Sequence, residues 1–149
     1  MKLEQRGSDH LDFVRKGPIY QIFPDRFARD ESVPADRPLV PWATEPTPQN
    51  FFGGNLRGVA SKLDYLSPLG AANIYFNPIF RAPSNHRYDT ENYLEIDPLL
   101  GSGEDLKALT ADARARGIGV RCAPPGRGRR GPRSRRDGIL SRCFATEAP

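Results

Sequence analysis

The chain has 149 residues, 38% of them hydrophobic and 27% charged, with a mean hydropathy of −0.59. This length is enough to bury a core, and the composition predicts one globular domain rather than a disordered protein. No apolar run approaches the roughly 18 residues of a membrane span, and no apolar stretch follows the polar N-terminus. The two cysteines, Cys122 and Cys143, have neither metal-binding spacing nor a disulfide framework. We therefore expect no membrane helix, no signal peptide and a cytoplasmic location.

The net charge of +4 is unevenly distributed along the chain. Residues 121–149 carry eight of the 22 basic residues, all of them arginines, but only two of the 18 acidic residues. The rest of the chain is slightly acidic. The basic charge is therefore no evidence that the whole protein binds nucleic acid.

Three short β-rich runs predict strands. Residues 19–23 form the first and are followed by Pro24, residues 73–77 form the second, and residues 118–120 begin the third. The first strand is followed by a long proline-rich loop that ends at Gly53 and Gly54. Paired glycines permit a tight turn or a close approach of two backbone segments.

Two helices are predicted between the strands. Apolar residues at helical spacing predict one amphipathic helix over residues 56–66, with a stop near Gly70. Ser102 and Asp105 resemble a capping box that begins a second helix, and Gly117 ends it. The order strand–helix–strand–helix–strand predicts an α/β fold with parallel strands and right-handed crossovers.

The loop over residues 84–98 is the candidate functional segment. It follows the second strand, and functional sites in α/β folds lie at the carboxyl ends of the strands. The loop concentrates a histidine, two tyrosines and several carboxylates. An aromatic ring beside hydrogen-bonding groups suits a hydroxyl-rich ligand such as a sugar.

The strand pattern stops at Val120. Residues 121–130 contain two prolines and several arginines, so we expect them not to continue a buried central strand. The predicted organisation is a leader over residues 1–17, a folded part over residues 18–120 and an irregular tail over residues 121–149. Three interpretations of the tail remain open: the product of a GC-rich gene read out of frame, a disordered tail, and an arginine-rich arm that binds nucleic acid.

Four motifs, in the order expected, resemble the α-amylase superfamily of glycoside hydrolases. The resemblance is strongest to the neopullulanase, cyclomaltodextrinase and maltodextrin glucosidase branch, and it covers roughly residues 11–120. The motifs are residues 19–27 (IYQIFPDRF), residues 52–58 (FGGNLRG), residues 66–80 and residues 84–98.

The resemblance implies a (β/α)₈ TIM barrel, a fold of about 250 residues. This chain would supply its first three strands and two helices, with Ile22 and Tyr75 facing the barrel interior. The implied activity is retaining hydrolysis of α-1,4-glucans, namely maltodextrins, cyclodextrins or pullulan. The family's catalytic carboxylates follow strands four, five and seven, so we expect no catalytic residue here and an inactive chain. A carbohydrate-binding remnant without catalysis is the alternative.

The resemblance also implies roles for residues of the loop. Tyr88 would stack on the sugar at the cleavage position, and His86 would donate a hydrogen bond to a sugar hydroxyl. Asp89 would hold the loop or pair with an arginine of the fourth strand. The alternatives are that Tyr88 packs the loop and that His86 has no function. For Asp25 and Arg26 we expect an internal ion pair.

Calcium is bound by several members of this branch, after the Asp-Arg-Phe motif and at an aspartate after the paired glycines. In this chain Arg29 places a cation among the expected ligands, and Asn55 replaces the aspartate with a neutral group. Calcium prefers several oxygen ligands with net negative charge. We therefore expect no calcium and no other cofactor.

Overall fold

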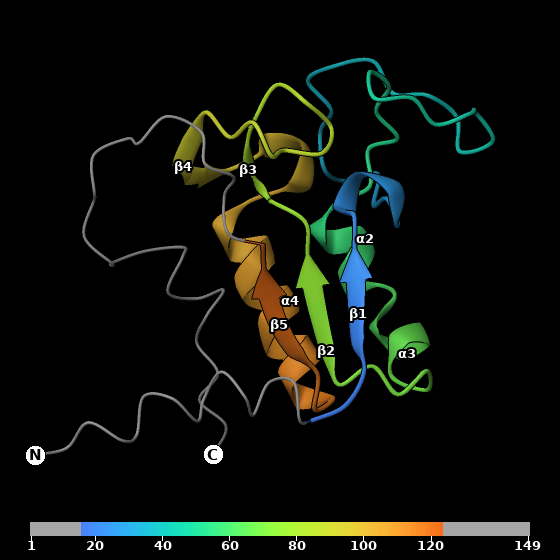
Figure 1. Ribbon diagram of the computed structural model, residues 1–149, viewed down its shortest axis with the longest axis vertical. Coiled ribbons are helices and arrows are strands. Elements are labelled where there is room, and N and C mark those ends of the chain that lie inside the picture. The colour runs from blue at the N-terminus through green and yellow to red at the C-terminus, as the bar shows by residue number, and fades with distance from the viewer. Residues whose placement is uncertain (1–15, 124–149) are drawn as a thin grey trace, which may run out of the picture.

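The computed structural model describes residues 16–123, and its centre is a parallel three-stranded sheet. The strands are β1 (Ile19–Ile22), β2 (Asn73–Phe76) and β5 (Gly119–Cys122), in the order β1-β2-β5 (Figure 1). Both pairings are parallel. The predicted α/β order and the parallel sheet are confirmed.

Three helices lie on one face of this sheet, behind the strands as Figure 1 is drawn. They are α2 (Leu56–Ala60), α3 (Leu63–Leu66) and α4 (Gly103–Ala115). The side chains between sheet and helices form one buried cluster, because alternate residues of each strand face the helices. From the strands these residues are Ile22, Ile74, Phe76, Val120 and Cys122.

The expected orientation of Ile22 is wrong. Ile22 is 1% exposed and belongs to the cluster on the helix side, whereas we expected it to face the barrel interior. Gln21 and Tyr75 are register partners one residue earlier on their strands, so they lie on the opposite face. Tyr75 therefore has the expected orientation, and the strand alternation explains why Ile22 does not.

The predicted helix over residues 56–66 is interrupted. Lys62 has φ −106° and ψ 7°, outside the helical region, so α2 ends and α3 begins on either side of it. The expected core positions are nevertheless correct, since the leucines and valine of both short helices are at most 1% exposed. The capping box of α4 is present, and Gly117 follows the helix with φ +73°.

Strand β5 continues two residues beyond the expected limit at Val120. Arg121 and Cys122 pair in register with Tyr75 and Phe76. We expected the strand to stop because Arg121 would need burial in the core. Instead, Arg121 is half-buried on the face away from the helices, while Cys122 is buried among them. Most of the predicted tail, residues 124–149, lies outside the described residues, as does most of the predicted leader.

The connection after β2 contains a second, two-stranded sheet that sequence reasoning missed. Strand β3 (Phe80–Arg81) precedes the expected loop and pairs antiparallel with β4 (Asn92–Ile96), which lies inside it. Two single-turn 3₁₀ helices, η1 (Pro24–Arg26) and η2 (Pro98–Leu100), follow β1 and β4. Figure 1 shows these connections gathered beyond the arrowheads of β1 and β2, where the site is built. In the described part, no helix is long and apolar enough to cross a membrane.

Candidate functional site

Asp25, at the carboxyl end of β1, organises the backbone around it. Its side chain is 1% exposed and accepts hydrogen bonds from the N–H groups of Phe52 and Gly53, each at 3.1 Å. Arg26 Nε lies 3.1 Å from Asp25 Oδ2, so the predicted internal ion pair is confirmed. A carboxylate with this many structural partners is not free to act on a ligand.

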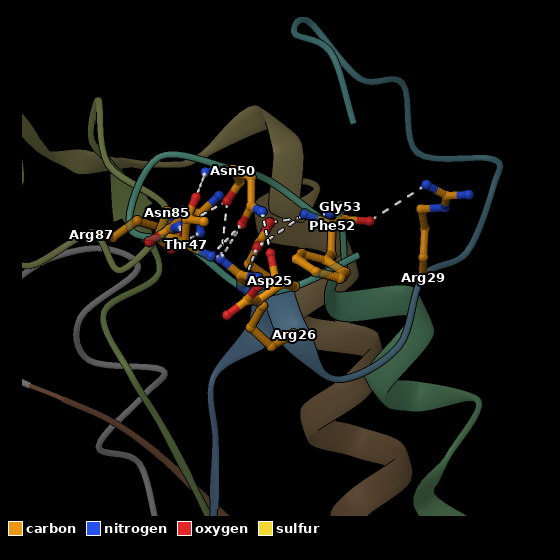
Figure 2. A network of polar contacts seen from close by, with 10 residues as sticks. Asp25, Arg26, Arg29, Thr47, Asn50, Phe52, Gly53, Asn85 and Arg87 are labelled. Atoms are coloured by element: carbon orange, nitrogen blue, oxygen red, sulfur yellow. Dashed lines mark hydrogen bonds and ion pairs between the residues drawn. The ribbon is translucent and has the colours of Figure 1, made fainter. Parts of the chain in front are cut away.

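Arg26 and Asn85 bind the same two carbonyl groups (Figure 2). Arg26 Nη2 lies 3.0 Å from both Thr47 O and Asn50 O, and Asn85 Nδ2 lies 3.3 and 2.8 Å from them. Asn85 is only 2% exposed. We call this arrangement the carbonyl bridge, because it joins the end of β1, the proline-rich loop and the start of the 84–98 loop. Sequence reasoning missed it.

Glycines allow the segment 53–58 to lie against the end of β1. A Cβ atom on Gly54 would lie 2.1 Å from Pro24 O, and one on Gly58 would lie 2.2 Å from Ala28 O. Both distances are too short for any side chain, so the close backbone approach predicted for the paired glycines is confirmed.

A buried ion pair closes the base of the 84–98 loop. Arg87 Nε lies 2.7 Å from Asp97 Oδ2, and Arg87 Nη1 donates to Asn85 O at 2.7 Å. With the base of the loop fixed, Tyr88 projects outward and is 45% exposed. The packing role considered for Tyr88 fits this exposure poorly.

The imidazole of His86 has a defined tautomer. Its Nδ1 accepts a hydrogen bond from the backbone N–H of Tyr88 at 3.1 Å. A nitrogen that accepts carries no proton, so the proton of the neutral ring is on Nε2. Hydrogen bonds among the described residues leave this Nε2–H without an acceptor. The ring lies 5.9 Å from that of Tyr88, centroid to centroid, so a free donor stands beside an exposed aromatic face.

Asp89 has a structural partner within the loop. It is exposed, and it accepts a hydrogen bond from the Ser84 hydroxyl, which also accepts from Arg87 N–H. This contact supports the loop-holding role expected for Asp89. The contacts of Tyr88, His86 and Asp89 with a substrate stay predictions.

A cavity of about 590 Å³ lies next to His86. Its wall comes from all three segments of the carbonyl bridge and includes Phe23, Arg26, Trp42, Phe52 and His86. This volume is within the range of small-molecule sites, about 300–1,000 Å³. The cavity was not expected from the sequence, because its walls are distant in the chain.

The residues where calcium was considered fit the ion poorly. Asn55 Nδ2 donates to Asp30 O at 2.9 Å and to Gly53 O at 3.4 Å, and Arg29 Nη1 donates to Phe52 O at 3.4 Å. Nitrogen donors thus occupy carbonyl oxygens that a cation would need. In the part of the chain that the structure describes, no group of three His, Cys, Asp or Glu residues could hold a metal.

A charged contact joins the helices beneath the site. Arg57 Nε of α2 lies 2.6 Å from Asp105 Oδ1 of α4, and this hydrogen bond raises the pKa of Arg57. Partial burial opposes the ionisation of Asp105, but hydrogen bonds from Arg57 and Ser102 outweigh it and lower its pKa. The contact supports the helices rather than the site.

Comparison with known proteins agrees with this geometry. The family model "Alpha amylase, catalytic domain" matches residues 21–122, more than half of the chain. A cyclomaltodextrinase of Geobacillus thermopakistaniensis is 50% identical over 110 residues, which are 73% of this chain and 19% of that protein. An intracellular maltogenic amylase of Bacillus subtilis is 43% identical over 110 residues, with the same coverage. The chain spans about a fifth of the length of these relatives.

Solved structures give the same result. The cyclic α-maltosyl-(1→6)-maltose hydrolase of Arthrobacter globiformis, in complex with cyclic α-maltosyl-(1→6)-maltose, superposes with a TM-score of 0.70 and 47% identity. The match covers 74% of this chain and 25% of that structure. The sequence match, the parallel sheet and the shared fold together show that the chain belongs to the alpha-amylase catalytic-domain family, of which it represents one part.

Proposed function

We propose that this chain is the N-terminal part of the (β/α)₈ barrel of an α-glucan hydrolase that acts in the cytoplasm. In the complete barrel, the enzyme would hydrolyse maltodextrins, cyclodextrins or pullulan with retention. One observation carries the proposal: the exposed ring of Tyr88 lies beside the imidazole of His86, whose Nε2–H has no acceptor in the described part of the chain, beyond the carboxyl ends of the parallel strands.

In this proposal, this part of the barrel contributes to substrate binding rather than to bond cleavage. Tyr88 would stack on the apolar face of a glucosyl ring, and His86 would donate to one of its hydroxyl groups. Retaining hydrolysis also needs two carboxylates about 5–5.5 Å apart, one nucleophilic and one acidic. The carboxylates around the site have structural partners instead, as described for Asp25, Asp89 and Asp97.

Two assays of the purified chain test this proposal. We expect no release of sugar from maltotriose, pullulan or β-cyclodextrin, and weak maltotriose binding that is lost in Tyr88→Ala. Tyr65→Ala is the matched control, because Tyr65 is 56% exposed on α3, among the helices on one face of the sheet. Turnover by a preparation free of host amylase would refute the inactivity, and absence of binding to any α-glucan would refute the site.

A carbohydrate-binding role without catalysis is the second candidate. The same observation favours this candidate. Tyr88 and His86 are groups suited to sugar binding, whereas the carboxylates described around the site all have structural partners. The nucleic-acid alternative depends on the arginine-rich stretch, most of which lies outside the described residues. A salt-dependent shift with DNA would support it, because phosphate contacts release counterions.

A further inference from the structure

The cavity beside His86 has aromatic walls. The Trp42 and Phe52 rings lie 5.6 Å apart, centroid to centroid, and the half-buried Phe23 lines the same space. Trp42, the only tryptophan of the chain, is 45% exposed. Exposed apolar residues are common, so exposure alone would indicate little. Here the exposed ring forms part of a cavity, and such a ring face suits the apolar side of a flat ligand.

The polar groups of the cavity suit a neutral ligand with hydroxyl groups. Thr47 lines the cavity, and its hydroxyl accepts from Asn50 N–H while its own proton needs another acceptor. The one charged residue in the wall, Arg26, forms an ion pair with Asp25 at 3.1 Å, so its charge is compensated. Its Nη2 binds three oxygens of the proline-rich loop, whereas its Nη1 is buried without a hydrogen-bond partner among the described residues. A neutral ligand therefore suits this wall better than an anionic one.

The cavity is formed in advance of any ligand. The carbonyl bridge fixes the proline-rich loop to the end of β1 and to buried Asn85, and the Arg26 guanidinium lies 4.2 Å from the Phe52 ring centroid. Walls held in this way lose little conformational entropy on binding, which favours affinity.

The cavity adjoins the predicted sugar position. His86 lines the cavity, and its ring lies beside that of Tyr88. Tyr88 itself does not line the cavity, so His86 is the residue that links the cavity to the predicted sugar position.

We propose that this cavity binds a further glucosyl unit of the same α-glucan chain, with Trp42 as its stacking surface and Thr47 as its hydrogen-bonding partner. The inference rests on the proposed function, because it needs a glucan at Tyr88. It adds a second binding position and assigns Trp42 a role in selecting chain length.

The experiment uses the fluorescence of Trp42 in the 149-residue chain. Titration with maltotriose should produce a saturable change in Trp42 emission that is the same at low and high sodium chloride, because the ligand is neutral. Methyl α-glucoside fills one position only and should bind more weakly. If the chain is insoluble alone, calorimetry on a fusion to a partner without sugar affinity replaces the fluorescence measurement.

Three variants measured by calorimetry separate the two binding positions. Trp42→Ala should weaken maltotriose binding about tenfold, the loss expected for one aromatic contact, and should reduce the preference for maltotriose over methyl α-glucoside. Tyr65→Ala, which truncates another exposed aromatic residue away from the cavity, should bind like the unmodified chain. Tyr88→Ala tests the proposed function instead, because it removes the ring on which the first sugar is predicted to stack.

The outcomes distinguish the two proposals. If Tyr88→Ala loses binding while Trp42→Ala binds like Tyr65→Ala, the cavity proposal is wrong and the proposed function stands. A Trp42 emission that stays constant while calorimetry detects maltotriose binding would also overturn the cavity proposal. If the chain and its fusion both fail to bind maltotriose, the proposed function and this inference are wrong together.

Discussion

Arg87 and Asp97 form an ion pair of 2.7 Å in which the two side chains are only 1% and 2% exposed. Asp97 also accepts a hydrogen bond from Leu99 N–H at 2.9 Å. Arg87 has φ +59°, a conformation that is costly for a residue with a side chain. The pair therefore holds a strained residue directly before Tyr88.

Asp97→Ala should destabilise the chain by about 3–5 kcal/mol, because it leaves the guanidinium of Arg87 buried without a counter-charge. The free energy of unfolding in urea measures this effect. Glu95→Ala is the control, since Glu95 pairs with Arg81 at 3.4 Å on the surface, with both side chains well exposed. Such exposed ion pairs contribute about 0–1 kcal/mol to the free energy of unfolding. Equal losses in the two variants would show that the Arg87–Asp97 pair has no special role.

Gly54→Ala and Gly58→Ala should each prevent the close packing of segment 53–58 against the end of β1. The new Cβ atoms would overlap backbone atoms of Pro24 and Ala28, which cannot rotate away as a side chain can. Limited proteolysis should cleave both variants faster than the unmodified chain.

Gly103→Ala is the matched control for these glycines. Gly103 begins α4, and a Cβ there meets no atom within 4 Å. Alanine favours helix over glycine by up to about 1 kcal/mol, so this variant should be as resistant to protease as the unmodified chain, or more so. Rapid cleavage of Gly103→Ala would point to a general sensitivity to alanine rather than to the close approach.

The Arg57–Asp105 contact should weaken in acid. Because the pKa of Asp105 is lowered by folding, its contribution is complete above the ordinary value of 3.8 and is lost as the pH falls through the lowered pKa. Asp105→Asn lacks this titration. The stability difference between the unmodified chain and the variant, followed by far-ultraviolet circular dichroism, should shrink below that pH. A difference that is constant with pH would contradict the assignment.

Calcium and its chelators should leave the melting temperature of the chain unchanged, because the Arg29 and Asn55 nitrogens occupy carbonyl oxygens that the ion would need. The double variant Arg29→Ala/Asn55→Asp removes both donors and adds a carboxylate. We expect calcium to raise the melting temperature of that variant, as any ligand of the folded state does. A calcium-dependent shift in the unmodified chain would refute this expectation.

Most of the fold followed from local sequence signals. The capping box at Ser102 and the glycine pair depend on neighbouring residues, and both proved correct. The apolar spacing over residues 56–66 gave the correct core positions but not the break between α2 and α3. The errors arose where tertiary contacts decide. The two-residue strand β3 has no periodicity to detect, and Arg121 was judged by its composition rather than by the face on which it lies.

The candidate site also has one part that was predictable from the sequence and one part that was not. His86 and Tyr88 are close in sequence, so their proximity was predictable. The carbonyl bridge was not, since Asn85 binds carbonyl groups 35 and 38 residues away, and backbone carbonyls have no sequence signature. The cavity depends on that bridge and was missed for the same reason.

The helix cap of α2 has a consequence for the order of folding. Asn55 Oδ1 accepts from Gly58 N–H within the helix and also from Asp30 N–H near the start of the preceding loop. A helix of five residues is too short to form by itself. One side chain therefore makes the start of α2 and the docking of the 28–30 segment a single event. Helix α2 should form late and cooperatively, as a product of chain closure rather than a nucleus for it.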